Sequence, residues 1–180
     1  MLHDNTLLIV GGTARNVGKT ELACRIIKKI STNNSVYALK VSAIFPDEGI
    51  YHGDHSGESG DQNLFEETRA DTAKDTSRML RAGAKRVFYL RCEDKGILDA
   101  FNRFRNQLPA NTAIVCESNS LAEYVQPGLL IMVKKDGEEI KPRARVRLEL
   151  ADLIIVSDGS SGFTELDQIH YNPANHWHLR

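Results

Sequence analysis

Short, strongly apolar runs alternate with amphipathic segments along most of this 180-residue chain. Runs such as Leu7-Leu8-Ile9-Val10 are too continuously apolar for a half-exposed strand, and they indicate strands that are buried on both faces. We expect strands at residues 6–10, 35–42, 85–91, 112–116, 128–133 and 152–156. Apolar residues that recur three and four positions apart predict helices at residues 18–31, 71–82, 94–108 and, as a short helix, 118–125. This alternation is typical of an α/β three-layer sandwich with a largely parallel sheet.

Residues 43–69 interrupt the pattern. The segment contains four glycines and many acidic residues, and no Lys or Arg occurs from residue 41 to residue 68. A long irregular loop in a compact domain is usually functional or disordered, so we expect an acidic loop that becomes ordered over a ligand. The tail from residue 159 has no clear pattern, although Trp177 is compatible with an edge strand. The length predicts a single domain that spans residues 1–180.

Composition excludes several classes of partner. Hydrophobic residues make up 41% of the chain, charged residues make up 26%, and the net charge is −1. No global field therefore favours nucleic acid or a membrane surface, and we predict neither as a partner. Cys24, Cys92 and Cys116 are too sparse for a disulfide framework, which favours a reducing compartment. Because no signal-peptide pattern and no membrane-length apolar run is present, we expect a cytoplasmic protein.

The segment that follows the first expected strand carries the most specific chemistry. Gly12-Thr13-Ala14-Arg15-Asn16-Val17-Gly18-Lys19-Thr20 lies between that strand and the first expected helix. A glycine-bearing loop that ends in Gly-Lys-Thr is typical of a phosphate-binding loop (P-loop). The strict pattern has glycine where this chain has Thr13, so an ordinary βα turn with a chance Gly-Lys-Thr is the alternative. The variant with threonine resembles the loop of dethiobiotin synthetases and their relatives among the P-loop nucleoside triphosphate hydrolases.

In such a loop, backbone N–H groups and the positive end of the helix dipole bind phosphate. Lys19 would reach the β- and γ-phosphates, and the Thr20 hydroxyl would bind Mg²⁺. We therefore predict a site for Mg²⁺ and for GTP or ATP. Its predicted nucleotide-binding residues are Gly12, Thr13, Ala14, Arg15, Asn16, Val17, Gly18, Lys19, Thr20 and Glu21.

The ends of other expected strands supply further candidates, because ligands collect at the carboxyl ends of parallel strands. Glu117 could hold Mg²⁺ or orient a water molecule, or it could be an acid that favours the start of the helix after it. Lys40 could neutralise phosphate or bind an acidic substrate, or it could be a solvated strand end. Asp158 follows a later strand. We predict Lys19, Lys40 and Glu117 as catalytic residues.

For the metal site we predict Thr20, Glu117 and Asp54, since Mg²⁺ prefers oxygen ligands. Asp47 is a second acidic candidate in the 43–69 loop. His52 and His55 have the spacing H-x-x-H, but without cysteines or a second histidine pair they are more typical of a solvated pair than of zinc. The basic residues Lys141, Arg143, Arg145 and Arg147 alternate along the chain, which is more typical of a solvated face than of a phosphate site.

Several of these residues occur in a familiar order. The loop 12–20, Lys40, the segment Lys74-Asp75-Thr76-Ser77-Arg78 leading to Ala82-Gly83-Ala84, and Val115-Cys116-Glu117 resemble the MobB-type molybdopterin-guanine dinucleotide biosynthesis adaptors. The resemblance covers about residues 6–120. The chain has Ser42-Ala43-Ile44-Phe45 where the family has a histidine-bearing segment, and Glu117-Ser118 where the family has Glu-Gly. The departures are those of a divergent paralogue that keeps the nucleotide site and changes its partner.

The resemblance implies a homodimer, with an apolar patch around the later strands, that binds GTP or ATP with Mg²⁺ and hydrolyses it slowly at best. It also implies a molybdopterin transferase as protein partner. Two alternatives remain open from the residues alone. The first is an ATP-dependent small-molecule ligase or kinase of the dethiobiotin-synthetase kind, with Lys40 on a carboxylate substrate. The second is a module that senses nucleotide without hydrolysing it.

Overall fold

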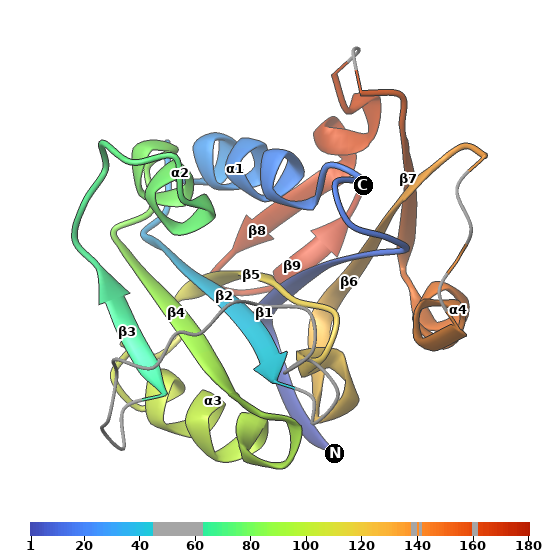
Figure 1. Cartoon of the computed structure of the whole chain (residues 1–180). Coiled ribbons are helices and arrows are strands. Elements are labelled where there is room, and N and C mark those ends of the chain that lie inside the picture. The colour runs from blue at the N-terminus through green and yellow to red at the C-terminus, as the bar shows by residue number, and fades with distance from the viewer. Residues whose placement is uncertain (45–62, 138–139, 141, 160–161) are drawn as a thin grey trace.

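A seven-stranded sheet forms the centre of the molecule (Figure 1). The computed structural model describes residues 1–44, 63–137, 140, 142–159 and 162–180. The strands of this sheet are β1 (Leu2–Gly12), β2 (Val36–Ile44), β3 (Leu64–Glu67), β4 (Arg86–Glu93), β5 (Ala113–Glu117), β6 (Val125–Lys135) and β7 (Leu153–Ser157). Their order across the sheet is β3-β4-β2-β5-β1-β6-β7. All neighbours pair in parallel except β3 and β4, so the expected α/β architecture with a largely parallel sheet is confirmed.

Helices cover both faces of the sheet and give the molecule three layers. The helices are α1 (Lys19–Ile30), α2 (Asp75–Arg81), α3 (Ile97–Arg105) and α4 (Pro142–Leu150). Figure 1 shows α1 and α2 on one face and α3 on the other. Strand β1 explains the arrangement, because Leu8 and Val10 belong to the core beneath α1, whereas Leu7 and Ile9 belong to the core above α3. All four side chains are fully buried, as the continuous apolar run predicts.

The end of the chain forms a separate hairpin. After a 3₁₀ turn, η4 (Thr164–Gln168), the strands β8 (Ile169–Asn172) and β9 (His176–Leu179) pair antiparallel. Tyr171 and Trp177 are buried, and Trp177 Nε1 donates a hydrogen bond to the carbonyl oxygen of Thr6 at 2.7 Å. Trp177 therefore lies in a strand, as expected, but this strand belongs to a second sheet that is anchored on β1.

Two expected elements differ from the structure. Residues 118–125 do not form a helix, because only a 3₁₀ turn, η3 (Leu121–Glu123), is present and β6 already begins at Val125. The Ser118 hydroxyl accepts the backbone N–H groups of Ser120 and Leu121, which fixes a tight turn there. Within the expected irregular segment 43–69, residues 64–67 form β3. This strand is held in place by antiparallel pairing with β4, which no periodic pattern in the sequence predicts. Residues 45–62 of that segment lie outside the described residues.

Of the alternating basic residues, Arg143, Arg145 and Arg147 lie in α4, whereas Lys141 lies outside the described residues. Arg147 pairs with Glu123 at 2.7 Å, and its side chain is only 14% exposed, whereas Arg145 is exposed. Residues two apart on a helix point about 200° apart, so these two side chains cannot form one basic face.

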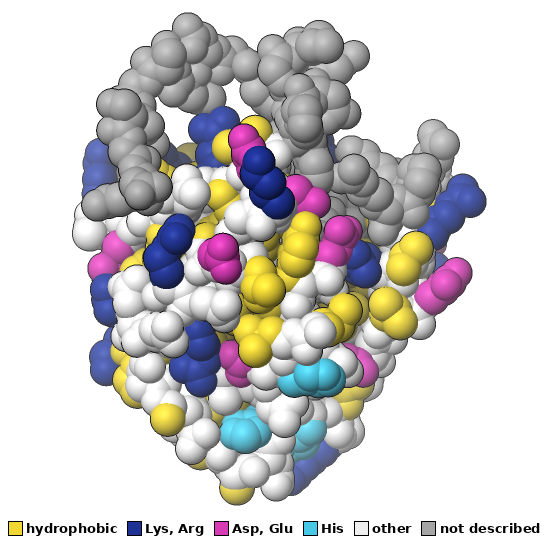
Figure 2. All heavy atoms as spheres, turned by 90° about the horizontal axis from the view of Figure 1, so that it is seen from below, with side chains coloured by type: hydrophobic (Ala, Val, Ile, Leu, Met, Phe, Trp, Pro, Cys, Tyr) yellow, Lys and Arg dark blue, Asp and Glu magenta, His cyan; other side chains and the backbone are white. Residues whose placement is uncertain are grey.

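The surface carries charges of both signs. On the face shown in Figure 2, the described basic and acidic side chains are interspersed with apolar ones. Among the described residues, no helix has both the length and the apolar character that a membrane span requires.

The packing of α3 gives a first prediction. Phe104 is fully buried, and its ring meets that of Phe88 edge to face with centroids 5.3 Å apart. Phe104→Ala should lower the free energy of unfolding by about 3–5 kcal/mol, because it leaves a cavity in the core. Phe104→Leu, which keeps most of the volume, should cost less. Urea denaturation measures both, and an Ala variant as stable as the parent chain would show that this packing is misassigned.

Candidate functional site

The loop between β1 and α1 depends on two glycines. A Cβ atom at Gly12 would lie 2.7 Å from Val17 Cγ2 and 2.9 Å from Lys19 Cγ, so any side chain there would displace the side chains of Val17 and Lys19. Gly18 has a φ of 101°, which is a left-handed conformation that glycine adopts without strain. The tight βα turn expected from the sequence is therefore present, with α1 starting at Lys19.

The first residues of the loop face the protein. The Gly12 N–H donates to Asn119 Oδ1 at 2.7 Å, and the Thr13 N–H donates to the Val133 carbonyl at 3.0 Å. Thr13 and Val17 are both 1% exposed. These residues therefore support the loop from below.

Part of the loop lines a cavity, whereas the predicted residues Gly12, Thr13, Ala14 and Val17 are not among the lining residues. The lining residues from the loop and the start of α1 are Arg15, Asn16, Gly18, Lys19, Thr20 and Glu21. Lys19 Nζ folds back to donate to the Ala14 carbonyl at 2.9 Å, so the ammonium group lies over the loop. The Lys19 ammonium group and the start of α1 therefore lie on the same concave surface.

Two predicted residues from other strands join the loop. Glu117 ends β5, Lys40 lies in β2, and the two are cross-strand partners in the parallel ladder. Lys40 Nζ lies 3.2 Å from Glu117 Oε1, while the Thr20 hydroxyl donates to Glu117 Oε2 at 2.7 Å. The Glu117 side chain is only 7% exposed. The three residues predicted separately at the sheet edge therefore form one polar cluster.

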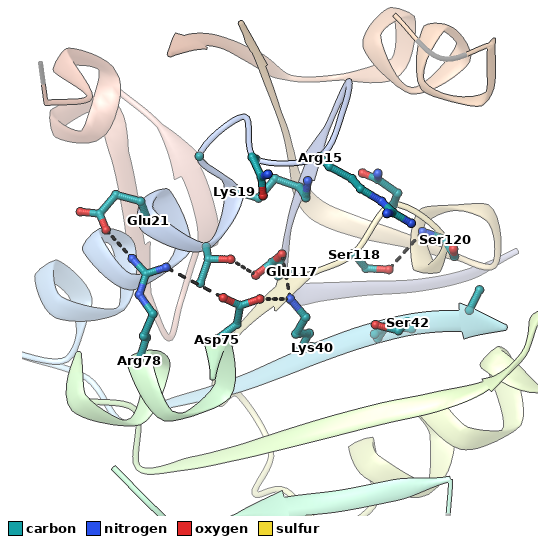
Figure 3. Close-up of a pocket in the computed structure, with 16 residues that line it drawn as sticks. Arg15, Lys19, Glu21, Lys40, Ser42, Asp75, Arg78, Glu117, Ser118 and Ser120 are labelled. Atoms are coloured by element: carbon teal, nitrogen blue, oxygen red, sulfur yellow. Dashed lines mark hydrogen bonds and ion pairs between the residues drawn. The ribbon is translucent and has the colours of Figure 1, made fainter. Parts of the chain in front are cut away.

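Helix α2 extends this cluster. Lys40 Nζ also donates to Asp75 Oδ2, and Arg78 donates to Glu21 Oε2 at 2.7 Å. Arg78 lies 3.9 Å from Asp75 as well, so one helical turn touches both the start of α1 and the lysine of β2. Figure 3 shows this chain of contacts running from Glu21 through Arg78, Asp75 and Lys40 to Glu117.

These residues enclose a cavity of about 600 Å³. That volume lies within the range of small-molecule sites. Beyond the cluster, the cavity is also lined by Val41, Ser42, Ala43, Ser118, Asn119 and Ser120. The cavity opens at the carboxyl ends of β1, β2 and β5, which is where parallel sheets bind ligands.

Charges in the cavity keep Lys40 protonated. Burial alone would lower the pKa of Lys40, but the Glu117 charge and the hydrogen bond to Asp75 outweigh it and raise the pKa above its usual value of 10.5. Burial raises the pKa of the Cys24 thiol to about 11, and it raises that of the fully buried Cys116 still more. Neither thiol is a nucleophile at neutral pH, since the thiolate is the reactive form. The cavity therefore offers a permanent cation and no reactive sulfur from these two cysteines.

The other predicted residues fall elsewhere. Asp54, Asp47, His52 and His55 lie outside the described residues, so the third predicted metal ligand is not placed. Asp158 is exposed after β7 and does not line the cavity.

Sequence reasoning did not select Ser42, Ser118 or Asn119 as site residues. It drew on Asp75 and Arg78 for the family resemblance. The position of Ser42, two residues after Lys40 on the same strand, was the available signal for that residue. The role of Asn119 arises from a contact across 107 positions and left no signal.

Comparison of the chain with protein-family models, with curated proteins and with solved structures found no match.

The buried Glu117 gives a prediction for stability. Lys40→Met should destabilise the fold by about 3 kcal/mol, because it leaves a buried carboxylate without its cation. Adding Glu117→Gln should restore part of the loss, and chemical denaturation of the two single variants and the double variant completes a double-mutant cycle. Additive effects of the two substitutions would contradict the ion pair.

The same pair has a pH signature. Since folding raises the pKa of Lys40, its stabilisation should be complete below pH 10.5 and should decline as the pH rises through the higher folded value. The stability gap between the parent chain and Lys40→Met should therefore stay constant from neutral pH to pH 10 and shrink above pH 10.5.

Proposed function

We propose that this chain is a P-loop protein that binds GTP or ATP together with Mg²⁺ on residues 12–21 and hydrolyses the nucleotide slowly. The observation that carries the proposal is the 2.7 Å contact between the Thr20 hydroxyl and the Glu117 carboxylate. Two neighbouring oxygen ligands of an octahedral Mg²⁺ ion lie about 3 Å apart, given Mg–O distances of about 2.1 Å. The donor set of this pair contains oxygen alone, which fits a hard cation.

The residues of the cavity have separable tasks in this proposal. The later loop N–H groups, beyond those of Gly12 and Thr13, would hold the phosphates together with the start of α1, and Lys19 would turn from the Ala14 carbonyl to the β- and γ-phosphates. Thr20 and Glu117 would hold Mg²⁺, which supplies charge neutralisation at the terminal phosphate. Lys40 stays protonated and adds a second positive charge beside Glu117. Catalysis then consists of positioning and charge stabilisation. An arginine can speed hydrolysis by stabilising charge on the transferred phosphoryl group, but Arg78 is engaged with Glu21 and Asp75, so we expect slow turnover.

The adaptor role rests on the resemblance to the MobB-type family, and the geometry supports one part of it. Asp75 and Arg78, which carry the resemblance in α2, both contact residues of the cavity. A molybdopterin transferase is the proposed partner, and the proposed compartment is the cytoplasm, in keeping with the free thiols of all three cysteines. Interspersed surface charge and a net charge of −1 favour neither nucleic acid nor a membrane as partner.

An apolar surface supports the proposed homodimer. Val146, Leu150, Ile154 and Val156 are 42–62% exposed, and they follow one another on α4 and on the adjacent edge strand β7. We call them the α4–β7 patch. Apolar residues grouped in this way are typical of protein contacts.

Nucleotide binding is tested by thermal unfolding with Mg²⁺ and GTP, ATP or their diphosphates. A ligand at a hundred times its Kd stabilises the folded state by about 2.7 kcal/mol, so the melting temperature should rise. Lys19→Ala should remove the shift, whereas Lys28→Ala, an exposed lysine on the same helix, should keep it. The preferred base separates a GTP-dependent adaptor from an ATP-dependent enzyme. If no nucleotide shifts the parent chain, the proposed function is wrong.

The homodimer is tested by light scattering over a range of concentrations. The parent chain should have twice the mass of one chain, and Ile154→Asp should shift it to the monomer because it places a charge in the α4–β7 patch. Leu2→Asp, at an apolar residue that is 39% exposed outside the patch, should leave the mass unchanged. A parent chain that is monomeric at all concentrations would exclude the dimer.

A further inference from the structure

The hairpin at the end of the chain carries a pair of histidines that the proposed function does not use. His170 of β8 and His178 of β9 are direct partners in the antiparallel ladder, so their side chains project from the same face. Tyr171 and Trp177, the next residue pair in the ladder, project from the opposite face and are buried in the core. The two histidines therefore lie on the outer face of the hairpin, where both are half-buried. Figure 1 shows this hairpin beside α1.

The two imidazole rings have nearly the separation that one shared metal ion requires. Their centroids are 5.8 Å apart, and their planes are inclined by 23°. A zinc ion lies about 2.0–2.1 Å from each histidine nitrogen and joins its ligands at tetrahedral angles, which places the centroids of two bound rings about 5–5.5 Å apart. The observed separation is slightly larger, so small rotations of the two side chains would bring both rings to one ion.

Each ring is oriented by a backbone carbonyl. His178 Nδ1 lies 3.0 Å from the carbonyl oxygen of His176. Because a carbonyl oxygen only accepts, Nδ1 carries the proton and Nε2 carries the lone pair. A hydrogen bond to the backbone of Asp167 raises the pKa of His170, as a bond donated to a carbonyl does. Histidines that bind a metal almost always donate their second ring nitrogen in this way, which fixes the orientation of the ring.

The lone pair of His178 has no use within the described part of the chain. Its Nε2 atom is buried and has no hydrogen-bond partner among the described residues. A buried acceptor that has lost its water without gaining a donor destabilises the folded state. A metal–nitrogen bond would use this lone pair and remove the penalty.

The surroundings keep His170 in the neutral form that can bind a metal. Burial is the largest cause that lowers its pKa below the usual 6.5, and the charges of Lys29, Arg180 and His178 lower the pKa further. These contributions outweigh the bond to Asp167. The same positive charges repel a metal ion, so we expect weaker binding than at a structural zinc site with four protein ligands.

We propose that His170 and His178 together bind one divalent transition-metal ion of the zinc type, which links β8 to β9 on the outer face of the hairpin. Imidazole nitrogen is a good ligand for zinc, whereas Mg²⁺ prefers oxygen, so this site differs in chemistry from the one proposed for the nucleotide. Among the described residues, no three His, Cys, Asp or Glu side chains are grouped to hold a metal, so water would complete the coordination. The inference does not depend on nucleotide binding.

The experiment titrates the full chain with Zn²⁺ in an excess of Mg²⁺. Competition with a chromogenic zinc chelator measures the affinity and the number of ions bound. His170→Gln and His178→Gln each remove one proposed ligand. His3→Gln, at an exposed histidine of β1, is the matched control. The double variant His52→Gln/His55→Gln tests the H-x-x-H pair of the sequence as a competing site.

Trp177 shows where the ion binds, because it is the one tryptophan of the chain and directly precedes His178. Co²⁺ occupies zinc-type sites and quenches tryptophan emission over short distances. Co²⁺ should therefore quench the emission of Trp177 in the parent chain, and Zn²⁺ should restore the emission by displacing Co²⁺.

The two hairpin variants should lose zinc binding at this site. Loss of a partner that orients a ligand weakens metal binding about 10–100-fold, so loss of the ligand itself should cost at least as much. Quenching of Trp177 by Co²⁺ should disappear in both variants and persist in His3→Gln and in the double variant. Urea denaturation without metal shows that each variant is folded.

Three results would overturn the inference. The first is a parent chain that binds no zinc and whose Trp177 emission Co²⁺ does not quench. The second is zinc binding and quenching that the folded hairpin variants keep. The third is zinc binding that only the double variant loses, which would assign the ion to His52 and His55. None of these results affects the proposed nucleotide site, which the thermal test decides by itself.

Discussion

The buried carboxylate of Glu117 constrains the centre of this molecule more than any other group. A carboxylate at 7% exposure is stable only if cations and donors replace the water it has lost. Lys40 of β2 and Thr20 of α1 do so, one at each oxygen. Three segments that are distant in the sequence must therefore meet within a few ångströms. The register between β2 and β5, which pairs Lys40 with Glu117, is fixed by this requirement as well as by the apolar core.

The core below the cluster makes this meeting possible. Leu8 and Val10 of β1 and Leu22 and Ile26 of α1 are fully buried in the same core, so the strand and the helix have little freedom to move apart. The loop between them must then reverse direction in a few residues, and Gly12 and Gly18 allow it to do so. Because the core is closely packed, the positions of the strands fix the positions of the residues that line the cavity.

Sequence patterns predict the parts of this structure that have a local cause. The central strands could be predicted because strands that are buried on both faces have continuously apolar sequences. Lys40 and Glu117 could be grouped because the carboxyl ends of parallel strands lie at one edge of the sheet. Strand β3 could not be predicted, since its four residues depend on pairing with β4. The turn after Glu117 was mistaken for a helix, because the Ser118 side chain decides the backbone there. Some contacts of the cavity could not be predicted because they join segments that are far apart in the sequence. They are those made by Asp75, Arg78 and Asn119.

The Lys40 ammonium group gives the cavity a counterion of its own. A divalent cation that approaches Glu117 meets a carboxylate whose two oxygens are already engaged, by an ammonium group and by a hydroxyl. It can bind only by competing with these intramolecular contacts, so bare metal gains little from the site. A metal already bound to phosphate oxygens, as in the proposed function, would bring its own charge balance and would only have to replace the hydrogen bond between Thr20 and Glu117. In the proposed nucleotide site, Mg²⁺ would therefore enter mainly as a complex with the phosphates, because the bare ion would have to compete with the ion pair and the Thr20 hydrogen bond.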